Sequence, residues 1–184
     1  FLKFNVDSSS VSLSEDKKNI FITVNISENN LFFNNEVTYA GDLPDSIPPQ
    51  AILEITKFII PNNIFSQETL TYAEDQITTL MSNQGFSSAE VVASTKDADK
   101  ESFVDITIFI DPGQRTYVRK INFSGNKRTH DVVLRREMRQ MEGSWASDIL
   151  IENSKRRLDR LGYFKEVEYE TTPVPGESDK IDIN

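Results

Sequence analysis

The sequence predicts an α+β protein made of tandem modules. Each module has the order strand, helix, helix, strand, strand, with a three-stranded mixed sheet packed on two helices. The first observation behind this prediction is an internal repeat with an offset of 84 residues. Ile20, Ile22, Val24 and Ile26 recur as Val104, Ile106, Ile108 and Ile110, and Phe33, Val37, Tyr39 and Gly41 recur as Tyr117, Ile121, Phe123 and Gly125. The second observation is that alternating segments flank pairs of segments with helical spacing. Repeats of this kind stack or string together, so the chain is expected to be an array.

The first predicted elements are a hairpin, a strand and a short helix. Residues 2–7 alternate between apolar and polar side chains, and residues 20–26 alternate again after a turn-like segment. A strand at 32–40 then ends at Gly41. Pro48 and Pro49 open a short helix, because proline is tolerated in a first turn.

The middle unit is completed by a second helix and two strands. Ser66 is a suitable N-cap for this helix, whose apolar residues recur at helical spacing, and Gly85 suits the left-handed position that ends it. The helix face consists of Leu70, Ala73, Ile77 and Leu80. Strands at 88–96 and 103–110 come next, and the second is expected to be central because it is the more apolar.

The same order then returns. A strand at 116–124 precedes a helix from about Thr129 to Glu142, a second helix from Ser147 to Leu161, a strand at 166–172 and a last strand around Ile181. Phe1, Phe86 and Tyr163 take equivalent places at helix exits. The expected division is therefore 1–27 as the end of one module, 28–111 as a complete module and 112–184 as a nearly complete one.

Composition limits the classes of function. The chain of 184 residues has no cysteine, one histidine and a net charge of −9, but residues 111–165 carry 13 Lys or Arg against 7 Asp or Glu. Such separation of charge favours an oriented protein surface. Motifs for nucleotide binding or hydrolysis are missing, so we expect no enzyme and no cofactor. His130 lacks companion ligands, so we expect no metal site.

Two segments resemble a known family. The run from Tyr117 to Asn126, YVRKINFSGN, and the run from Val133 to Gly143, VLRREMRQMEG, resemble POTRA (polypeptide-transport-associated) domains, above all those of BamA-like assembly factors. The likeness covers the whole chain. It implies the end of a third POTRA, a fourth, and a fifth that adjoins a membrane barrel. It also implies a place at the periplasmic face of the Gram-negative outer membrane and a scaffold role in assembling barrel proteins.

The resemblance implies a partner site in the last module. Arg135, Arg139 and Glu142 have the spacing of one helical stripe, while Leu134, Met138 and Met141 form the neighbouring stripe, which is expected to pack into the core. The alternative is a solvated polar face with an Arg139–Glu142 pair. In the family this region contacts a BamD-like lipoprotein. Charge reversal at Glu142 or Arg135 is then expected to weaken binding without changing the melting of the protein.

Trp145 completes the predicted partner site. It comes after Gly143 in the loop between the helices, where an exposed tryptophan would anchor an interface. The alternative is a core position, as for most tryptophans in small modules.

Edge strands suggest a second function, the capture of unfolded outer-membrane proteins by β-augmentation, in which backbone hydrogen bonds give affinity nearly independent of sequence. The candidate strands are 2–7, 89–95 and 166–171, where the last carries glutamates that discourage pairing. The candidate residues are Phe4, Val6, Val91, Ala93, Val167 and Tyr169. The alternative is that these edges pair with nothing.

Two other classes of protein share features with this chain. A KH-like nucleic-acid module has the same element order, but neither loop between helices has the GXXG sequence that approaches phosphates, and we expect no nucleic acid. POTRA modules also occur in other barrel-linked transporters, including two-partner secretion. The run through Glu142 favours the assembly factors.

Overall fold

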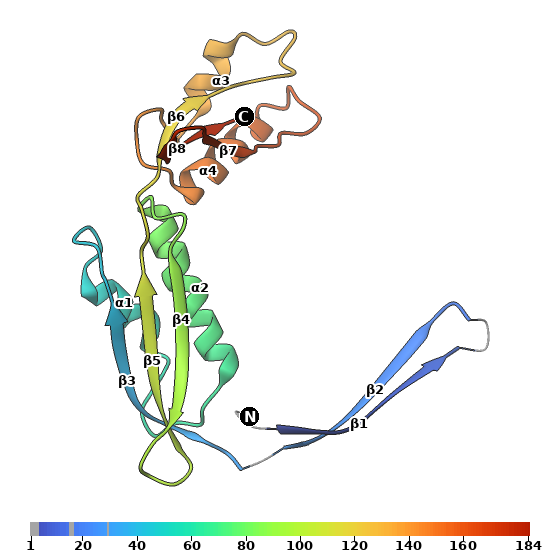
Figure 1. Cartoon of the computed structure of the whole chain (residues 1–184). Helices are drawn as coiled ribbons and strands as arrows, with labels where there is room; N and C mark the ends of the chain where they lie inside the picture. Colours follow the sequence, from blue (N-terminus) through green and yellow to red (C-terminus); the bar gives the residue numbers. More distant parts are fainter. Residues whose placement is uncertain (1–3, 15–16, 29) are drawn as a thin grey trace.

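The computed structural model describes residues 4–14, 17–28 and 30–184, so Phe1 and the first two residues of the strand predicted at 2–7 lie outside the described residues. Three separate sheets succeed one another along the chain (Figure 1). They belong to the N-terminal hairpin, a middle module of residues 33–111 and a C-terminal module of residues 116–184. No helix among the described residues is long and apolar enough to cross a membrane.

The N-terminal hairpin pairs β1 (Phe4–Leu13) with β2 (Ile20–Glu28) in antiparallel register. It projects away from the middle module (Figure 1). Val11 lies opposite Ile22 and Leu13 opposite Ile20, so their side chains share one face of the ribbon. These four side chains are between 62 and 69% exposed. The hairpin therefore carries an apolar face that no described element covers.

The middle module has the predicted architecture. Its sheet has the order β3-β5-β4, with β3 (Phe33–Gly41) parallel and β4 (Glu90–Asp97) antiparallel to the central β5 (Phe103–Asp111). Helices α1 (Pro49–Thr56) and α2 (Gln67–Asn83) supply the apolar side chains that pack on this sheet. The core is continuous and consists of Ile47, Ile52, Ile59, Phe65, Leu70, Ala73, Ile77, Met81, Val104, Ile106, Ile108 and Ile110.

Helix signals in the middle module act as predicted. The Ser66 hydroxyl accepts a hydrogen bond from the Thr69 amide at 3.3 Å, which caps the start of α2. Gly85 has φ of +95°, a left-handed conformation that suits glycine after the last turn. Leu80 is only partly buried, whereas Met81 is fully buried, so the apolar face is displaced by one residue at its end.

The C-terminal module repeats this plan with shorter elements. Its sheet has the order β6-β8-β7, formed by β6 (Tyr117–Ile121), β7 (Thr171–Val174) and the central β8 (Glu177–Ile183). The helices are α3 (Asp131–Glu137) and α4 (Asp148–Arg160). The central position of the last strand is thus confirmed in both modules.

Three predicted elements of the C-terminal module were too long or displaced. The strand predicted at 116–124 ends at Ile121. The first helix ends at Glu137 and not at Glu142, because Met138 has an extended backbone with ψ of 139°. The strand predicted at 166–172 begins only at Thr171, and of the preceding five residues only Glu170 is bonded to the chain end, through Asn184. Alternation of glutamates with apolar residues therefore did not produce a regular strand there.

A cavity of about 390 Å³ lies between β6, the two helices and residues 164–170. Strand register explains it. Ile183 pairs with Ile121 as Ile106 pairs with Val37 in the middle module, where β5 then continues through the buried Ile108 and Ile110. The cavity therefore corresponds to core in the other copy and is not evidence of a ligand site.

Candidate partner-binding site

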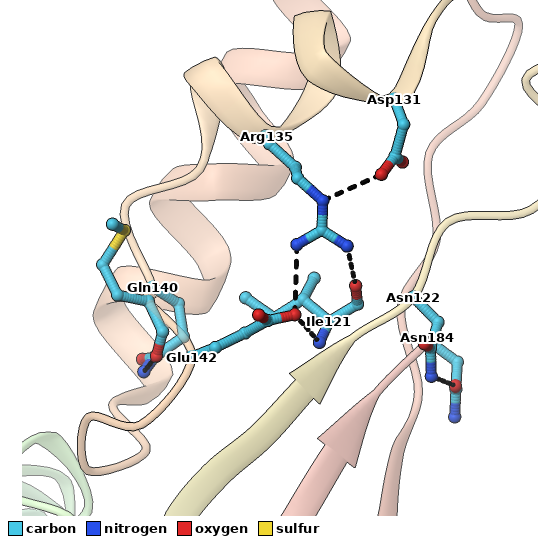
Figure 2. A network of polar contacts seen from close by, with 8 residues as sticks. Ile121, Asn122, Asp131, Arg135, Gln140, Glu142 and Asn184 are labelled. Carbon is cyan, nitrogen blue, oxygen red and sulfur yellow. Dashed lines mark hydrogen bonds and ion pairs between the residues drawn. The ribbon is translucent and has the colours of Figure 1, made fainter.

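Arg135 and Glu142 form a polar network around the backbone of Ile121 (Figure 2). The Ile121 amide donates to Glu142 Oε1 at 2.8 Å, and Arg135 donates to the Ile121 carbonyl at 2.9 Å. Arg135 also pairs with Glu142 at 3.0 Å and with Asp131 at 2.8 Å. The network therefore joins α3, the loop after it and the outer edge of β6.

Within this network, Arg135 and Glu142 each favour the charged form of the other. The Ile121 amide, and then Arg135, lower the pKa of Glu142 below its ordinary value of 4.5. Asp131 and then Glu142 raise the pKa of Arg135 above its ordinary value. Both side chains remain more than 40% exposed, so a partner could reach them without displacing the core. Their geometry also satisfies two backbone groups of an edge strand, which is a structural role.

Arg139 does not share a helical stripe with Arg135 and Glu142, contrary to the prediction from spacing. The helix ends before it, so periodicity of 3.6 residues no longer relates these positions. Arg139 is exposed, and no ion pair joins it to Glu142, which pairs with Arg135. Met141 is 62% exposed and does not pack into the core as expected, whereas Leu134 is buried and Met138 packs against the core.

The early end of α3 depends on Gln140, a residue that sequence reasoning missed. Its side chain is fully buried, accepts from the Ser147 amide at 3.0 Å and donates to the Trp145 carbonyl at 2.9 Å. The amides of Arg139 and Gln140 both donate to the Ser154 hydroxyl. These bonds replace those of a continued helix. A glutamine within a polar run gives no sequence signal for such a role.

Trp145 lies at the contact between the two modules. Its ring lies over the Arg115 guanidinium, 4.4 Å from the ring centre, and the centre of the Phe86 ring is 5.4 Å from the same cation. The Arg115 Nε also donates to the Gln84 carbonyl at 2.8 Å. Trp145 is still 42% exposed, but its ring already makes a contact within the chain. Trp145 therefore belongs both to the exposed surface and to the contact between the two modules. We call this contact, made by Gln84, Phe86, Arg115 and Trp145, the joint.

The joint also supplies the cap of α4. Ser147, at the N-cap position, makes no capping bond with its side chain, and the Asn83 side chain of α2 accepts from the Ile149 amide at 3.0 Å. Asp148 accepts from Ser82 at 2.5 Å in the same place. A helix of one module is thus capped by a side chain of the module before it. Spacing along the sequence cannot reveal such a cap.

The predicted peptide edges differ in how open they are. On β4, the Ala93 amide donates to the Glu74 carboxylate of α2 at 2.5 Å, so this edge is occupied beside Val91. Val167 and Tyr169 lie outside any regular strand, which contradicts their placement on an edge strand. Phe4 and Val6 lie in β1, and the Val6 side chain is 56% exposed.

The surface around α3 combines cations with apolar side chains. Arg136 and Arg139 are exposed, Val132 is 71% exposed, and Met141 lies beside them in the sequence. His130 lies at the start of the helix and is exposed. Such a mixture suits a partner surface that is acidic with apolar patches.

The comparisons with known proteins agree with one another. A family model described as "POTRA: Surface antigen variable number repeat" matches residues 34–113 and again 116–184. The outer membrane protein assembly factor BamA of Neisseria meningitidis is 29% identical over the whole chain, and the chain spans 23% of that relative. BamA of Buchnera aphidicola is 29% identical over 98% of the chain, which spans 29% of it. The chain therefore spans less than a third of the length of these curated relatives.

One solved structure resembles the whole chain, and another resembles most of it. The Haemophilus influenzae BamA POTRA3-5 structure is 28% identical with a TM-score of 0.78, covering 99% of this chain and 71% of that one. BamA from Haemophilus ducreyi lacking POTRA domains 1-3 is 33% identical with a TM-score of 0.71, covering 83% of this chain and 28% of that one. With two family matches in tandem and the fold of both modules, the chain belongs to the POTRA family.

Proposed function

We propose that this chain is a periplasmic scaffold of the machinery that assembles β-barrel proteins in the outer membrane. It docks a BamD-like lipoprotein at its C-terminal module and guides unfolded barrel proteins toward a membrane barrel. The observation that carries the proposal is the likeness of the whole chain to a BamA POTRA3-5 fragment. In this assignment the module at 28–111 is the fourth POTRA and that at 112–184 the fifth.

The N-terminal hairpin fits the same assignment as the last two strands of a third POTRA, residues 1–27. Its apolar residues repeat those of β5, and β5 packs against α1 and α2 in the middle module. The uncovered face of β2 is then the face that two helices cover in a complete module. The antiparallel pair β1-β2 corresponds to the antiparallel pair β4-β5 of the middle module, which supports the interpretation of the chain as a tandem array.

The partner surface is defined by the exposure of the side chains. Arg139, Arg136 and Met141 are exposed to a partner, while Arg135 and Glu142 hold β6 beneath them. Trp145 borders this surface from the joint. We therefore assign direct contact first to Arg139 and Met141, and a positioning role to Arg135 and Glu142.

Binding to a purified BamD-like lipoprotein tests the proposal. In biolayer interferometry, Arg139→Glu is expected to weaken binding about tenfold, because a cation at an interface contributes on the order of 1–2 kcal/mol. Arg160→Glu makes the same charge change at the end of α4 and serves as the matched control. Equal affinity of the Arg139 variant and the wild type would remove Arg139 from the site. No binding by the wild type would reject the lipoprotein partner.

A further inference from the structure

The edge strands β3, β4 and β6 differ in how many of their outward backbone groups are already hydrogen-bonded. On β6, the Tyr117 region pairs with the loop, since the Val118 amide donates to the Ser144 carbonyl and the Gly143 amide donates to the Val118 carbonyl. Further along the strand, the Ile121 amide donates to Glu142, and Arg135 donates to the Ile121 carbonyl. The β6 edge is therefore bonded along its length and cannot accept another strand.

The edge of β4 is closed at its centre. Glu74 reaches from α2 and accepts the Ala93 amide. A carboxylate so placed removes the central donor of the edge and puts a negative charge where an incoming carbonyl would lie. Glu74 thus closes the edge of β4 as Glu142 closes that of β6.

The edge of β3 is closed only at its beginning. Asn34 exchanges hydrogen bonds with the loop at Asn62 and Asn63, in the manner of Val118. Val37 takes the place of Ile121 in the repeat, and both positions come after a register shift. An isolated bridge of Ile64 with Phe33 also lies at the start of β3. Further along, no side chain among the described residues bonds to the backbone of 37–41 on the side away from β5.

Strand geometry gives the direction of these free groups. The Asp42 amide donates to the Ile110 carbonyl of β5, so the alternate residues Gly41, Tyr39 and Val37 direct their amides and carbonyls away from β5. Residues 38–41 are exposed. This stretch of backbone offers the ladder of donors and acceptors that an extended chain requires.

An apolar pocket adjoins the free edge. It has a volume of about 190 Å³ and lies between the end of β3 and α1, where Tyr39, Leu43, Ile52 and Leu53 meet. Leu53 is 55% exposed and Tyr39 is 40% exposed, although the Tyr39 hydroxyl is bonded to Thr56. A strand added beside β3 would place alternate side chains on the helix side of the sheet, toward this pocket.

Charge specifies the occupant further. Asp42 lines the pocket, Asp45 and Glu36 are exposed nearby in the sequence, and Lys57 is paired with Glu54. The surroundings are therefore acidic. We infer that the β3 edge at 37–41, with its pocket, binds an extended segment of an unfolded polypeptide that carries an apolar side chain flanked by Lys or Arg. This inference rests on the proposed handling of unfolded barrel proteins and assigns it to a strand.

Nuclear magnetic resonance of the ¹⁵N-labelled chain tests the inference. The probe is an eight-residue blocked peptide that alternates Thr with Ile and has one Lys near each end. We expect amide shifts at 37–41 and at Leu43 and Leu53, with none at 90–97 or 117–121. Two control peptides carry N-methyl groups on alternate residues, in one phase or the other. Since one edge of the peptide faces β3, one phase loses binding and the other keeps it.

A pair of variants locates the side-chain contact. Leu53→Glu is expected to weaken the peptide about tenfold, since it removes an apolar wall and adds a like charge to an acidic site. Ile149→Glu makes a matched change at an exposed apolar side chain of α4 and leaves affinity unchanged. Shifts confined to β4, or equal affinity of both variants, would overturn the β3 site while leaving client handling in place. Absence of all shifts would overturn both. Shifts at β3 that grow with protein concentration alone would overturn the peptide site and assign the edge to a second copy of the chain.

Discussion

Replacement of Glu142 by glutamine separates a structural role of this residue from a contact role. Glutamine keeps the size and one acceptor oxygen but loses the charge that holds the Ile121 amide and the Arg135 guanidinium. A pure contact residue would change binding alone. A residue that closes the β6 edge would change stability too, which differs from the sequence-based expectation of unchanged melting.

The size of the effect is set by the two bonds. A hydrogen bond to a charged group contributes about 1.5–3 kcal/mol, but the Glu142 side chain is 41% exposed, which reduces the figure to about 1 kcal/mol when glutamine still accepts weakly. The exposed pair with Arg135 adds roughly 0.3 kcal/mol. A loss of about 1.3 kcal/mol lowers the Tm of a chain of this size by about 3–5 °C.

Fluorescence of Trp145 provides the assay, because it is the single tryptophan and lies in the C-terminal module. Glu152→Gln is the matched control, since Glu152 pairs with Arg156 at 3.9 Å on the surface of α4. That variant is expected to melt within about 1 °C of the wild type, on the order of an exposed pair. If Glu142→Gln melts like the control yet loses the lipoprotein, the structural reasoning is refuted.

The pH dependence of the melting temperature provides a second test of Glu142→Gln. Because the folded pKa of Glu142 lies below its ordinary value of 4.5, ionised Glu142 stabilises the fold above that pH, and the contribution is lost as pH falls through the folded pKa. The difference in Tm between wild type and Glu142→Gln should therefore be full at about pH 7 and shrink below about pH 4.5. A difference that stays constant down to acid would contradict this account.

Three further variants address the joint and the edges. Gly85→Ala should destabilise the chain by about 2 kcal/mol, since a Cβ would lie 2.8 Å from that of Trp145 at φ of +95°, whereas Gly162→Ala has open space and should cost about 1 kcal/mol in thermal melts; equal losses would argue against the contact. Asn83→Ala should lower stability by about 1 kcal/mol in the same melts, because it removes the cap of α4, and an unchanged Tm would show that water replaces it. Glu74→Ala frees the Ala93 amide, so peptide-induced shifts should spread to β4, and shifts still confined to β3 would deny Glu74 a protective role.

The element order could be predicted from the sequence because it depends on local patterns. The apolar character of β5 placed it at the centre of its sheet, and Ser66 and Gly85 marked the ends of α2 through interactions with their own neighbours. These signals act over a few residues. They therefore do not depend on contacts with distant segments.

The site could be predicted only in part because it depends on contacts between distant segments. Helical spacing placed Arg139 beside Arg135, but buried Gln140 and the Ser154 hydroxyl end the helix first. Glu142 was identified by resemblance, while its bond to Ile121 requires β6 to pass beside the loop. Glu74 gave no signal at all, since a glutamate on a helix surface is ordinary.

The cap that Asn83 supplies to α4 gives the folding of this chain a direction. The last helix obtains its N-terminal partner only when α2 has already formed, so the C-terminal module gains stability from the module that emerges before it during synthesis. The middle module has a continuous core of its own and draws no equivalent cap from the C-terminal module. Order would then spread from the N-terminal side toward the end that adjoins the barrel in the proposed array.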